Sequence, residues 1–385
     1  MKENLLVVHG GGPTTVINAS LYGVIKEALK HDDIGAIYGA LGGVDGIFNK
    51  SFVDFRQQSE EQIELLPFTP ASAIGTSRKH LKSSDYETIV EILKECNIKY
   101  LLFNGGNGSM DTCGKIYKLA KEYGIDVIGI PKTIDNDIAV TDHSPGFGSA
   151  ARYMAVSVSE VAQDIKAMPI HVCIIEAMGR NAGWIAASSA LARKKAGDAP
   201  HLIYLPEKPF NTEEFLKDVK DLYDKLGGVV VVVSEGLKNE NGEPIVEPVL
   251  KQGRDVYFGD VSAHLALLVM KELGIKARSE KPGILGRASA TLQSSVDREE
   301  AIKVGEFAVQ QILEGKTGFM VGLNRVSNNP YQCEPVLIPL EDVMMHEKKM
   351  PESYINSRGN DVTEEFVEYC RPLIGGPLPQ YAEFR

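Results

Sequence analysis

The sequence lacks the features that mark exported, membrane-spanning and nucleic-acid-binding proteins. Apolar runs such as Val229–Val233 have the length of a β-strand, which is far too short to cross a membrane. Only four apolar residues follow the N-terminal Met-Lys-Glu-Asn, too few for a signal peptide. The formal net charge of −11 leaves no basic excess to neutralise a nucleic-acid backbone. We therefore expect a soluble, cytoplasmic protein that binds neither nucleic acid nor membrane.

Cysteine is scarce, and its five copies are scattered along the chain. None forms a CxxC pair, and their number is odd; they are Cys96, Cys113, Cys173, Cys333 and Cys370. Disulfide frameworks and structural zinc sites need clustered or regularly spaced cysteines. The pattern therefore predicts reduced thiols in a cytosolic protein, and neither a zinc site nor a catalytic thiol.

Two common nucleotide-binding signatures are also missing. The first glycine-rich segment, His9-Gly10-Gly11-Gly12-Pro13, is not followed by the Gly-Lys-Ser/Thr of a Walker A loop. It also lacks the third glycine of the dinucleotide-binding motif. A nicotinamide-dependent oxidoreductase is therefore a weak alternative, which titration with the cofactor would test.

What is present is an alternation of short apolar runs with segments of helical period, which predicts an α/β fold. The predicted strands are 5–8, 34–38, 100–103, 127–130, 172–175, 202–205 and 229–233. A helix is predicted to end near residue 30, and others to span 84–96, 109–123, 149–166, 182–194, 212–226, 260–273 and 297–314. Continuous apolar strands between helices indicate mostly parallel sheets covered on both faces.

With 385 residues, the chain is long enough for two domains. We expect two Rossmann-like lobes with the active site in the cleft between them. The first predicted lobe comprises 1–138 and about 260–325, and the second comprises 139–259. Residues 326–385 are expected to wrap the lobes as an irregular C-terminal extension, and 238–254 to form a surface excursion.

Four strand-to-helix corners carry residues suited to phosphate chemistry. The glycines at 10–12 and the segment Asn104-Gly105-Gly106-Asn107-Gly108-Ser109 let backbone N–H groups at a helix start approach a phosphate. Each corner alone could be a plain tight turn. Two such corners in one chain favour a phosphate-binding role.

The third corner, Pro131-Lys132-Thr133-Ile134-Asp135-Asn136-Asp137, combines a cation, a hydroxyl and two carboxylates. Phosphoryl transfer to an alcohol needs a carboxylate to accept the hydroxyl proton and cations to offset phosphate charge. The alternative is an Asx-turn with structural side chains. In the fourth corner, Met178-Gly179-Arg180, the planar fork of Arg180 suits a phosphate, although an exposed salt-bridging arginine would look the same.

In this order, the four corners resemble those of the phosphofructokinase family, over roughly residues 4 to 325. The resemblance implies that Asp135 is the general base on the sugar 1-hydroxyl, with Asp137, Thr133 and the cation Lys132 supporting it. It implies that Arg180 stabilises the transition state. By motif position, Gly12, Arg78, Gly106, Asn107, Gly108 and Ser109 would bind the donor, and Met178, Gly179, Glu235, His171 and Arg287 would join Thr133, Asp135 and Arg180 at the sugar phosphate.

The resemblance also implies Mg²⁺, with Asn107 standing where the family usually has a magnesium-associated aspartate. His171 stands where many bacterial members carry an arginine for the 6-phosphate, and Arg287 resembles the arginine that pyrophosphate-type members use there. Members typically form homodimers or homotetramers with shared substrate pockets, so a homo-oligomer is expected.

Two positions bear on the phosphoryl donor, and they disagree. Gly108 leaves room for a nucleotide, where pyrophosphate users commonly have aspartate, whereas Lys132 is typical of pyrophosphate users. Because steric room is the harder constraint, the sequence favours ATP, with pyrophosphate as the alternative. The predicted reaction is therefore phosphoryl transfer from ATP to the 1-hydroxyl of fructose 6-phosphate, in glycolysis. Another ketose phosphate, such as sedoheptulose 7-phosphate, remains an alternative acceptor, and a non-catalytic sugar-phosphate sensor an alternative role.

Overall fold

The computed structural model describes residues 2–252, 255–382 and 384, and the chain divides into two compact units. Unit 1 comprises Met1–Ser149 and Arg287–Lys348, and unit 2 comprises Ala150–Gly286 and Lys349–Arg385. The division differs from the predicted boundaries at 138, 260 and 326. The strands that follow residue 318 extend the sheet of unit 1, and the helix near the C-terminus packs within unit 2, so no separate C-terminal extension is formed.

Unit 1 is built on a seven-stranded sheet in the order β13-β12-β5-β4-β1-β2-β3. Its strands are β1 (Glu3–His9), β2 (Ile34–Ala40), β3 (Phe52–Asp54), β4 (Ile98–Gly105), β5 (Asp126–Pro131), β12 (Phe319–Asn328) and β13 (Tyr331–Pro339). The five inner strands pair in parallel, and β3 and β13 are antiparallel edge strands.

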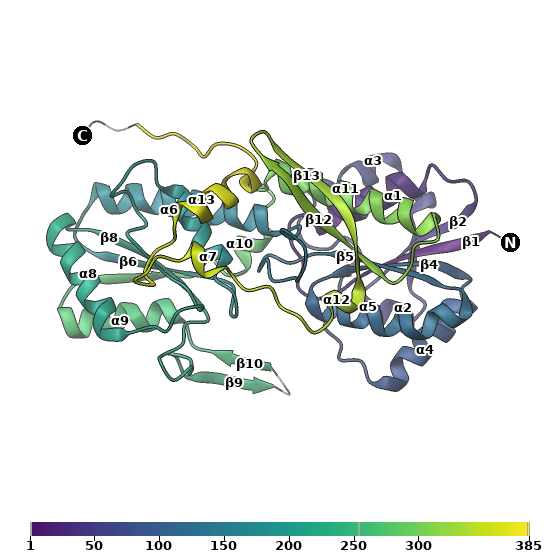
Figure 1. The fold of residues 1–385 in the computed structure, drawn as a ribbon, viewed down its shortest axis with the longest axis horizontal. Helices are drawn as coiled ribbons and strands as arrows, with labels where there is room; N and C mark the ends of the chain where they lie inside the picture. Colours follow the sequence, from purple (N-terminus) through teal and green to yellow (C-terminus); the bar gives the residue numbers. More distant parts are fainter. Residues whose placement is uncertain (1, 253–254, 383, 385) are drawn as a thin grey trace. The chain divides into compact units, whose positions relative to one another are not determined.

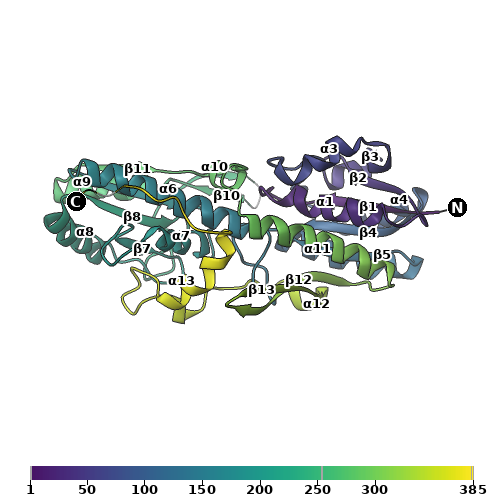
Figure 2. The same ribbon diagram turned by 90° about the horizontal axis from the view of Figure 1, so that it is seen from above.

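Helices cover both faces of this sheet (Figures 1 and 2). Helices α1 (Ile17–Ala28) and α11 (Ser295–Leu313) lie side by side on one face, and α2 (Val44–Phe48), α4 (Ser83–Glu95) and α5 (Asn107–Ala120) lie on the other. Along β1, Leu5 and Val7 pack into the first layer, and Leu6 and Val8 into the second. Both faces of the strand are therefore buried, which is why it is a continuous apolar run.

Unit 2 has a four-stranded parallel sheet in the order β11-β6-β8-β7. Its strands are β6 (Val172–Ala177), β7 (Leu202–Tyr204), β8 (Val229–Ser234) and β11 (Ala277–Glu280). Helix α6 (Phe147–Ala167) covers one face, while α8 (Thr212–Leu226) and α9 (Val261–Leu273) cover the other (Figure 1). The hairpin of β9 (Pro248–Gln252) and β10 (Asp255–Phe258) is a separate two-stranded sheet.

The smaller helices complete the two units. They are α3 (Glu60–Glu64) and α12 (Leu340–Val343) in unit 1, and α7 (Trp184–Ser188), α10 (Ile284–Ala288, which spans the boundary at 286) and α13 (Glu364–Cys370). Trp184 of α7 packs against Tyr354, Phe366 and Tyr369. This aromatic cluster fixes the C-terminal residues onto unit 2.

The predicted strands are all present, and most predicted helices are found within a few residues. Gly124 adopts the left-handed conformation (φ 69°) expected of a residue that ends a helix. Asn211 caps α8 by accepting a hydrogen bond from the Glu214 N–H at 3.0 Å. The α/β architecture with two mostly parallel sheets is therefore confirmed. Among the described residues, no helix has the length and apolar character needed to cross a bilayer, and the five cysteines, all of them described, form no disulfide.

Two predicted helices differ from those in the structure. Helix α4 begins one residue before its predicted start, and its Asp85 accepts from the Lys82 N–H at 2.7 Å. The helix predicted over 182–194 is shorter, with α7 followed by a 3₁₀ turn at Ser189–Ala192. In the predicted surface excursion, residues 240–251 are mostly exposed and the segment contains β9; its predicted end, Arg254, lies outside the described residues.

Unit 1 contains a buried ionic network at the start of the connection to α6. The His143 ring lies between two carboxylates, with Nδ1 2.8 Å from Asp142 and Nε2 2.6 Å from Glu300. Arg325 binds Asp142 at 3.0 Å, and the Tyr331 hydroxyl donates to Glu300 at 2.6 Å. Although burial opposes it, the two carboxylates raise the pKa of His143 to about 9.

Replacing His143 with glutamine should therefore destabilise unit 1 in a pH-dependent way. Because the folded-state pKa lies above the unfolded value, the stabilisation is complete below about pH 6.5 and is lost as pH rises through about 9. The variant should be less stable by about 3 kcal/mol at pH 6 and by much less at pH 9.5.

Urea unfolding followed by circular dichroism would measure this, while the fluorescence of Trp184, the single tryptophan, reports on unit 2 separately. The exposed His80, changed to glutamine, is the matched control. A deficit that stays the same at both pH values would contradict the ion-pair explanation.

Candidate active site

Three of the four predicted corners meet at one edge of the sheet of unit 1. Strands β5, β4 and β1 are neighbours and run in parallel, and they end at Pro131, Gly105 and His9. The carboxyl ends of parallel strands are where open α/β sheets bind their ligands. The structure thus brings together the segments at 10–12, 104–109 and 131–137.

The glycine corner after β1 is hydrogen-bonded to the neighbouring segment 76–78. The Gly11 N–H donates to the Ser77 carbonyl at 2.9 Å, and the Thr76 hydroxyl donates to the Gly11 carbonyl at 2.7 Å. This pairing places Arg78, the next residue, beside the glycines.

Two guanidinium groups lie against Gly12. A side-chain Cβ at this position would be 2.7 Å from Nη1 of Arg287 and 3.1 Å from Nη2 of Arg78. A larger residue would have to displace these flexible side-chain ends, so glycine at this position allows both arginines to approach the backbone closely. Arg287, which was predicted to bind the sugar phosphate, thus lies at the glycine corner of unit 1, beside the predicted donor residues.

Lys132 is the third cation at the glycine corner. Its side chain is buried, and Nζ donates to the carbonyls of Gly10 at 3.0 Å and Gly12 at 2.6 Å. Burial, followed by repulsion from Arg287 and Arg78, lowers the pKa of Lys132 to about 8. Three cations this close together repel one another, and a bound anion would relieve that repulsion. The corner is therefore chemically suited to a phosphate.

The second corner is the N-terminus of helix α5, where Gly106 precedes Asn107, Gly108 and Ser109. The free N–H groups of a first helical turn and the helix dipole favour an anion. A Cβ added to Gly108 would meet no heavy atom within 4 Å, so the space beside it is open. The amide of Asn107 donates to Asp137 Oδ2 at 2.9 Å.

The acidic turn after β5 is tied together by its own side chains. The Thr133 hydroxyl accepts from the Asp135 N–H at 3.1 Å. Asp135 is half-buried, and its charge partly offsets the lowering of the pKa values of Lys132 and Arg287 that burial and the neighbouring cations cause. Burial raises the pKa of Asp137. Both carboxylates are thus partly buried, and Asp135 lies within the field of the cationic corner.

The fourth corner belongs to unit 2, where β6 and β8 are parallel neighbours. The Gly179 N–H donates to the Glu235 carboxylate at 3.2 Å, and the Ser234 hydroxyl donates to the Gly179 carbonyl at 2.7 Å. A Cβ at Gly236 would lie 1.8 Å from the Arg180 carbonyl oxygen, so only glycine permits this approach. The predicted residues at 178–180 and Glu235 are therefore brought together.

Arg180 is exposed and is contacted by the β9–β10 hairpin. Its Nη1 donates to the Val256 carbonyl at 3.1 Å, and its guanidinium lies 5.4 Å from the centre of the Phe258 ring. These contacts hold the guanidinium, and no carboxylate among the described residues forms an ion pair with it. The fork can therefore still offer donors to a phosphate.

His171 is not brought to this corner. It precedes β6, whereas Met178–Arg180 follow the end of the same strand, so about 20 Å of extended chain separates them. Both ring nitrogens of His171 are buried and have no hydrogen-bond partner in the described part of the chain. Within one chain, His171 cannot join the other predicted sugar-binding residues of unit 2.

Two lysines near the predicted corners were not found by sequence reasoning. Lys281 lies 3.0 Å from the carboxylate of Glu176, the residue two before Met178. Lys348, from the segment after α12, contacts the acidic turn of unit 1. Neither stands in a recognisable motif, so only the fold reveals their positions.

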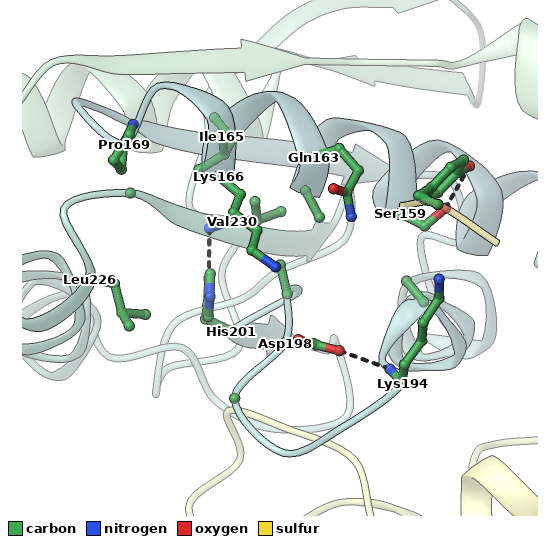
Figure 3. Close-up of a pocket in the computed structure, with 16 residues that line it drawn as sticks. Ser159, Gln163, Ile165, Lys166, Pro169, Lys194, Asp198, His201, Leu226 and Val230 are labelled. Atoms are coloured by element: carbon green, nitrogen blue, oxygen red, sulfur yellow. Dashed lines mark hydrogen bonds between the residues drawn. The ribbon is translucent and has the colours of Figure 1, made fainter. Parts of the chain in front are cut away.

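A pocket of about 250 Å³ in unit 2 lies elsewhere (Figure 3). It is lined by the C-terminal half of α6 and by residues that precede β6, β7 and β8, including Lys166, Lys194 and His201. His201 accepts a hydrogen bond from the Val230 N–H at 3.0 Å. The pocket is thus at the amino ends of the strands, and none of the predicted site residues lines it.

One group of side chains in the described residues has the spacing of a metal site: His143, Glu300 and Cys333. Both nitrogens of His143 already lie at hydrogen-bond distance from carboxylates, and burial raises the pKa of the Cys333 thiol to about 12. A metal would have to break these bonds and deprotonate the thiol. The group is better explained as an ionic network.

Comparisons with known proteins identify the family of the chain. The phosphofructokinase family profile matches residues 4–312. The pyrophosphate–fructose 6-phosphate 1-phosphotransferase of Rhodospirillum rubrum is 39% identical over all of this chain and 97% of its own length. The sulfofructose kinase of Alkalicoccus urumqiensis is 36% identical, over 91% of each chain. The crystal structure of a pyrophosphate-dependent phosphofructokinase from Marinobacter aquaeolei superposes with a TM-score of 0.89 at 38% identity, covering 99% of this chain and 94% of that one. The chain belongs to the phosphofructokinase family.

Proposed function

We propose that the protein transfers a phosphoryl group from pyrophosphate to the 1-hydroxyl of fructose 6-phosphate. The observation that carries this proposal is the convergence of Lys132, Arg78 and Arg287 on the glycine corner, beside Asp135. A compact, highly charged donor matches three converging cations. Relatives that align over nearly the whole chain are named for this reaction.

The proposed mechanism divides the work between named residues. Asp135 accepts the proton of the attacking hydroxyl, and Thr133 and Asp137 orient the turn that carries it. Arg180 and the three cations of unit 1 offset the charge that develops on the transferred group. Glu235, which binds the Gly179 N–H, lies where it can orient a sugar hydroxyl.

Oxygen groups suited to Mg²⁺ lie beside the donor corner. Asn107 Oδ1 is buried and has no hydrogen-bond partner in the described part of the chain, and the Asp135 carboxylate belongs to the neighbouring turn. Such hard oxygen ligands fit this ion. Asn107 and Asp135 would hold the ion, which supplies charge neutralisation on the donor phosphates when bound.

The relatives favour pyrophosphate over ATP. Pyrophosphate is the alternative donor predicted from the sequence. Lys132 also bears more directly on the choice of donor than Gly108 does, because its ammonium binds the backbone of the glycine corner that would hold the donor. ATP remains the second candidate because of one observation. The space beside Gly108 is open, as a nucleotide would require.

The direct test is a matrix of two donors against fructose 6-phosphate, with Mg²⁺ and purified protein. We expect kcat/KM with pyrophosphate to exceed that with ATP by at least about 100-fold, a difference of about 3 kcal/mol in transition-state stabilisation. Formation of fructose 1,6-bisphosphate is measured through a coupled aldolase assay. A preference for ATP would select the second candidate, and no turnover with either donor would favour a sugar-phosphate sensor.

Changing Gly108 to aspartate should separate the two donors. The side chain enters open space, and an acidic residue is favourable in a first helical turn, so folding and pyrophosphate turnover should change by less than about threefold. Any residual use of ATP should fall at least about tenfold, because the carboxylate would repel the inner phosphates. Steady-state kinetics with both donors measures this, and equal losses would refute the steric argument.

The acceptor and the assembly state are further parts of the proposal. Because one relative is named a sulfofructose kinase, the acceptor panel should include sulfofructose and sedoheptulose 7-phosphate beside fructose 6-phosphate. His171 lies away from the Met178–Arg180 corner of its own chain, so a sugar-binding role for it requires a second subunit. A homodimer or homotetramer is therefore proposed, and light scattering would measure its mass.

A further inference from the structure

The segment that ends unit 1 runs along the acidic turn. After helix α12 the chain turns back, and the Lys348 N–H donates to the Asp137 carbonyl at 2.8 Å. Glu347 forms an isolated antiparallel bridge with Ile138. Residues more than 200 positions apart are thus joined by backbone hydrogen bonds directly beside the predicted catalytic residues.

The Lys348 ammonium binds the two sides of this turn together. Nζ donates to Asn136 Oδ1 at 3.2 Å, to the Thr141 carbonyl at 3.2 Å and to the Asp142 carbonyl at 2.8 Å. An ammonium has three donor hydrogens, and here it has three acceptors on one loop. The side chain therefore acts as a clamp between residue 136 and residues 141–142.

The side-chain acceptor of the Lys348 ammonium belongs to a residue with an unusual backbone conformation. Asn136 lies between Asp135 and Asp137 and adopts a left-handed backbone with φ 52°. Asparagine is one of the few side-chain-bearing residues that adopt this conformation routinely, because its short polar side chain can form local hydrogen bonds. Asn136 Oδ1 accepts from both the Ser144 N–H, at 3.1 Å, and Lys348 Nζ. The backbone at Asn136 sets the directions of the two flanking carboxylates.

We propose that Lys348 is a positioning residue. By holding Asn136 in its left-handed conformation, it fixes the orientation of the Asp135 and Asp137 carboxylates in the turn that follows β5. The inference rests on the proposed phosphotransferase function. Lys348 acts through Asn136 and Asp137 and is assigned no contact with either substrate. Misplacing a catalytic group by about 1 Å can cost about 100-fold in rate, so a clamp of this kind should affect turnover more than binding.

The test compares Lys348→Met with the wild type, using pyrophosphate and fructose 6-phosphate. Methionine keeps the length and apolar stem of the side chain but removes all three donors. We expect kcat to fall about 100-fold with each KM changed less than about threefold, because Arg78, Arg180 and Glu235 are not altered. Lys349→Met, at the exposed neighbouring position, is the matched control and should retain wild-type kinetics.

A second measurement separates positioning from simple folding. In Lys348→Ala, added propylammonium should restore kcat at least about fivefold, with saturation, because the ion can occupy the vacated donor site. Added tetramethylammonium, which has no N–H donor, should not. Loss of folded protein alone would lower activity in proportion to the folded fraction and would not respond selectively to the amine.

The outcomes are distinct from those of the proposed function. Failure of the wild type to turn over would overturn both proposals. An active wild type with Lys348→Met within threefold of its kcat would overturn only the clamp. If Lys348→Met does not fold, Lys348→Arg carries the test, since a planar guanidinium keeps the charge but not the three-oxygen geometry. A kcat at least fivefold lower with unchanged KM supports the clamp, and wild-type kcat overturns it.

Discussion

Replacing Asp135 with asparagine is expected to lower kcat by about 10³-fold, within the range that a general base contributes. Asparagine has nearly the same shape but cannot accept the hydroxyl proton at neutral pH. The Thr133 hydroxyl, which accepts from the backbone N–H of residue 135, should hold the turn equally well in the variant. The KM values should change little if Mg²⁺ remains bound through the donor phosphates. Steady-state kinetics with pyrophosphate and fructose 6-phosphate measures the effect.

The matched control for this variant is Asp126→Asn. Asp126 begins the same strand, β5, at the opposite end of the sheet and pairs with Lys99 at 3.0 Å. An ion pair near the surface contributes about 0–1 kcal/mol, so this control should retain nearly full activity. Turnover of Asp135→Asn within tenfold of the wild type would remove Asp135 from the role of base. Unchanged thermal unfolding of both variants is required for the comparison.

The sequence was sufficient for the elements whose signals are local. The strands of both sheets are short apolar runs, and the loops after β1, β4 and β5 are marked by glycines and by the acidic turn. Because parallel strands share one carboxyl edge, predicting the strands also predicted that these loops would meet. The fold class and three corners of the site therefore followed from patterns only a few residues long.

The parts that were missed depend on contacts between distant residues. Strand β13 is defined by its pairing with β12 and not by a local sequence pattern, and so it was assigned to an irregular extension. The start of α4 was predicted one residue late, because its N-cap is Lys82, and lysine is not a residue whose type signals a helix start. Lys348 reaches Asn136 only because α12 and the chain after it fold back onto unit 1.

The preference for ATP shows the limit of an argument from one position. Gly108 is open in the structure, as predicted, but an open position permits a nucleotide without attracting one. Lys132 is buried and makes two hydrogen bonds to the glycine corner, so it shapes the charge of the donor site directly. From the sequence, the steric signal looked stronger because the reach of the lysine could not be seen.

Replacing Arg180 with lysine should lower kcat about 10³-fold, the lower end of what a transition-state arginine contributes. Lysine keeps the positive charge but loses the planar fork that binds two phosphate oxygens at once. Since the charge is retained, the loss would measure geometry rather than net electrostatics. The KM for the sugar phosphate should change much less than kcat, because the interaction strengthens mainly in the transition state.

The contacts of Arg180 with the hairpin require their own control. Lysine would also lose the packing of the guanidinium over Phe258, so Phe258→Leu tests how much that packing alone contributes. Cation–π contacts at exposed sites contribute about 0.5–1 kcal/mol, which limits the expected loss in Phe258→Leu to about fivefold. Arg371→Lys, at an exposed position of the same unit, should be neutral. If Phe258→Leu is as inactive as Arg180→Lys, the arginine acts through the hairpin, and its assignment to the transferred phosphoryl group fails.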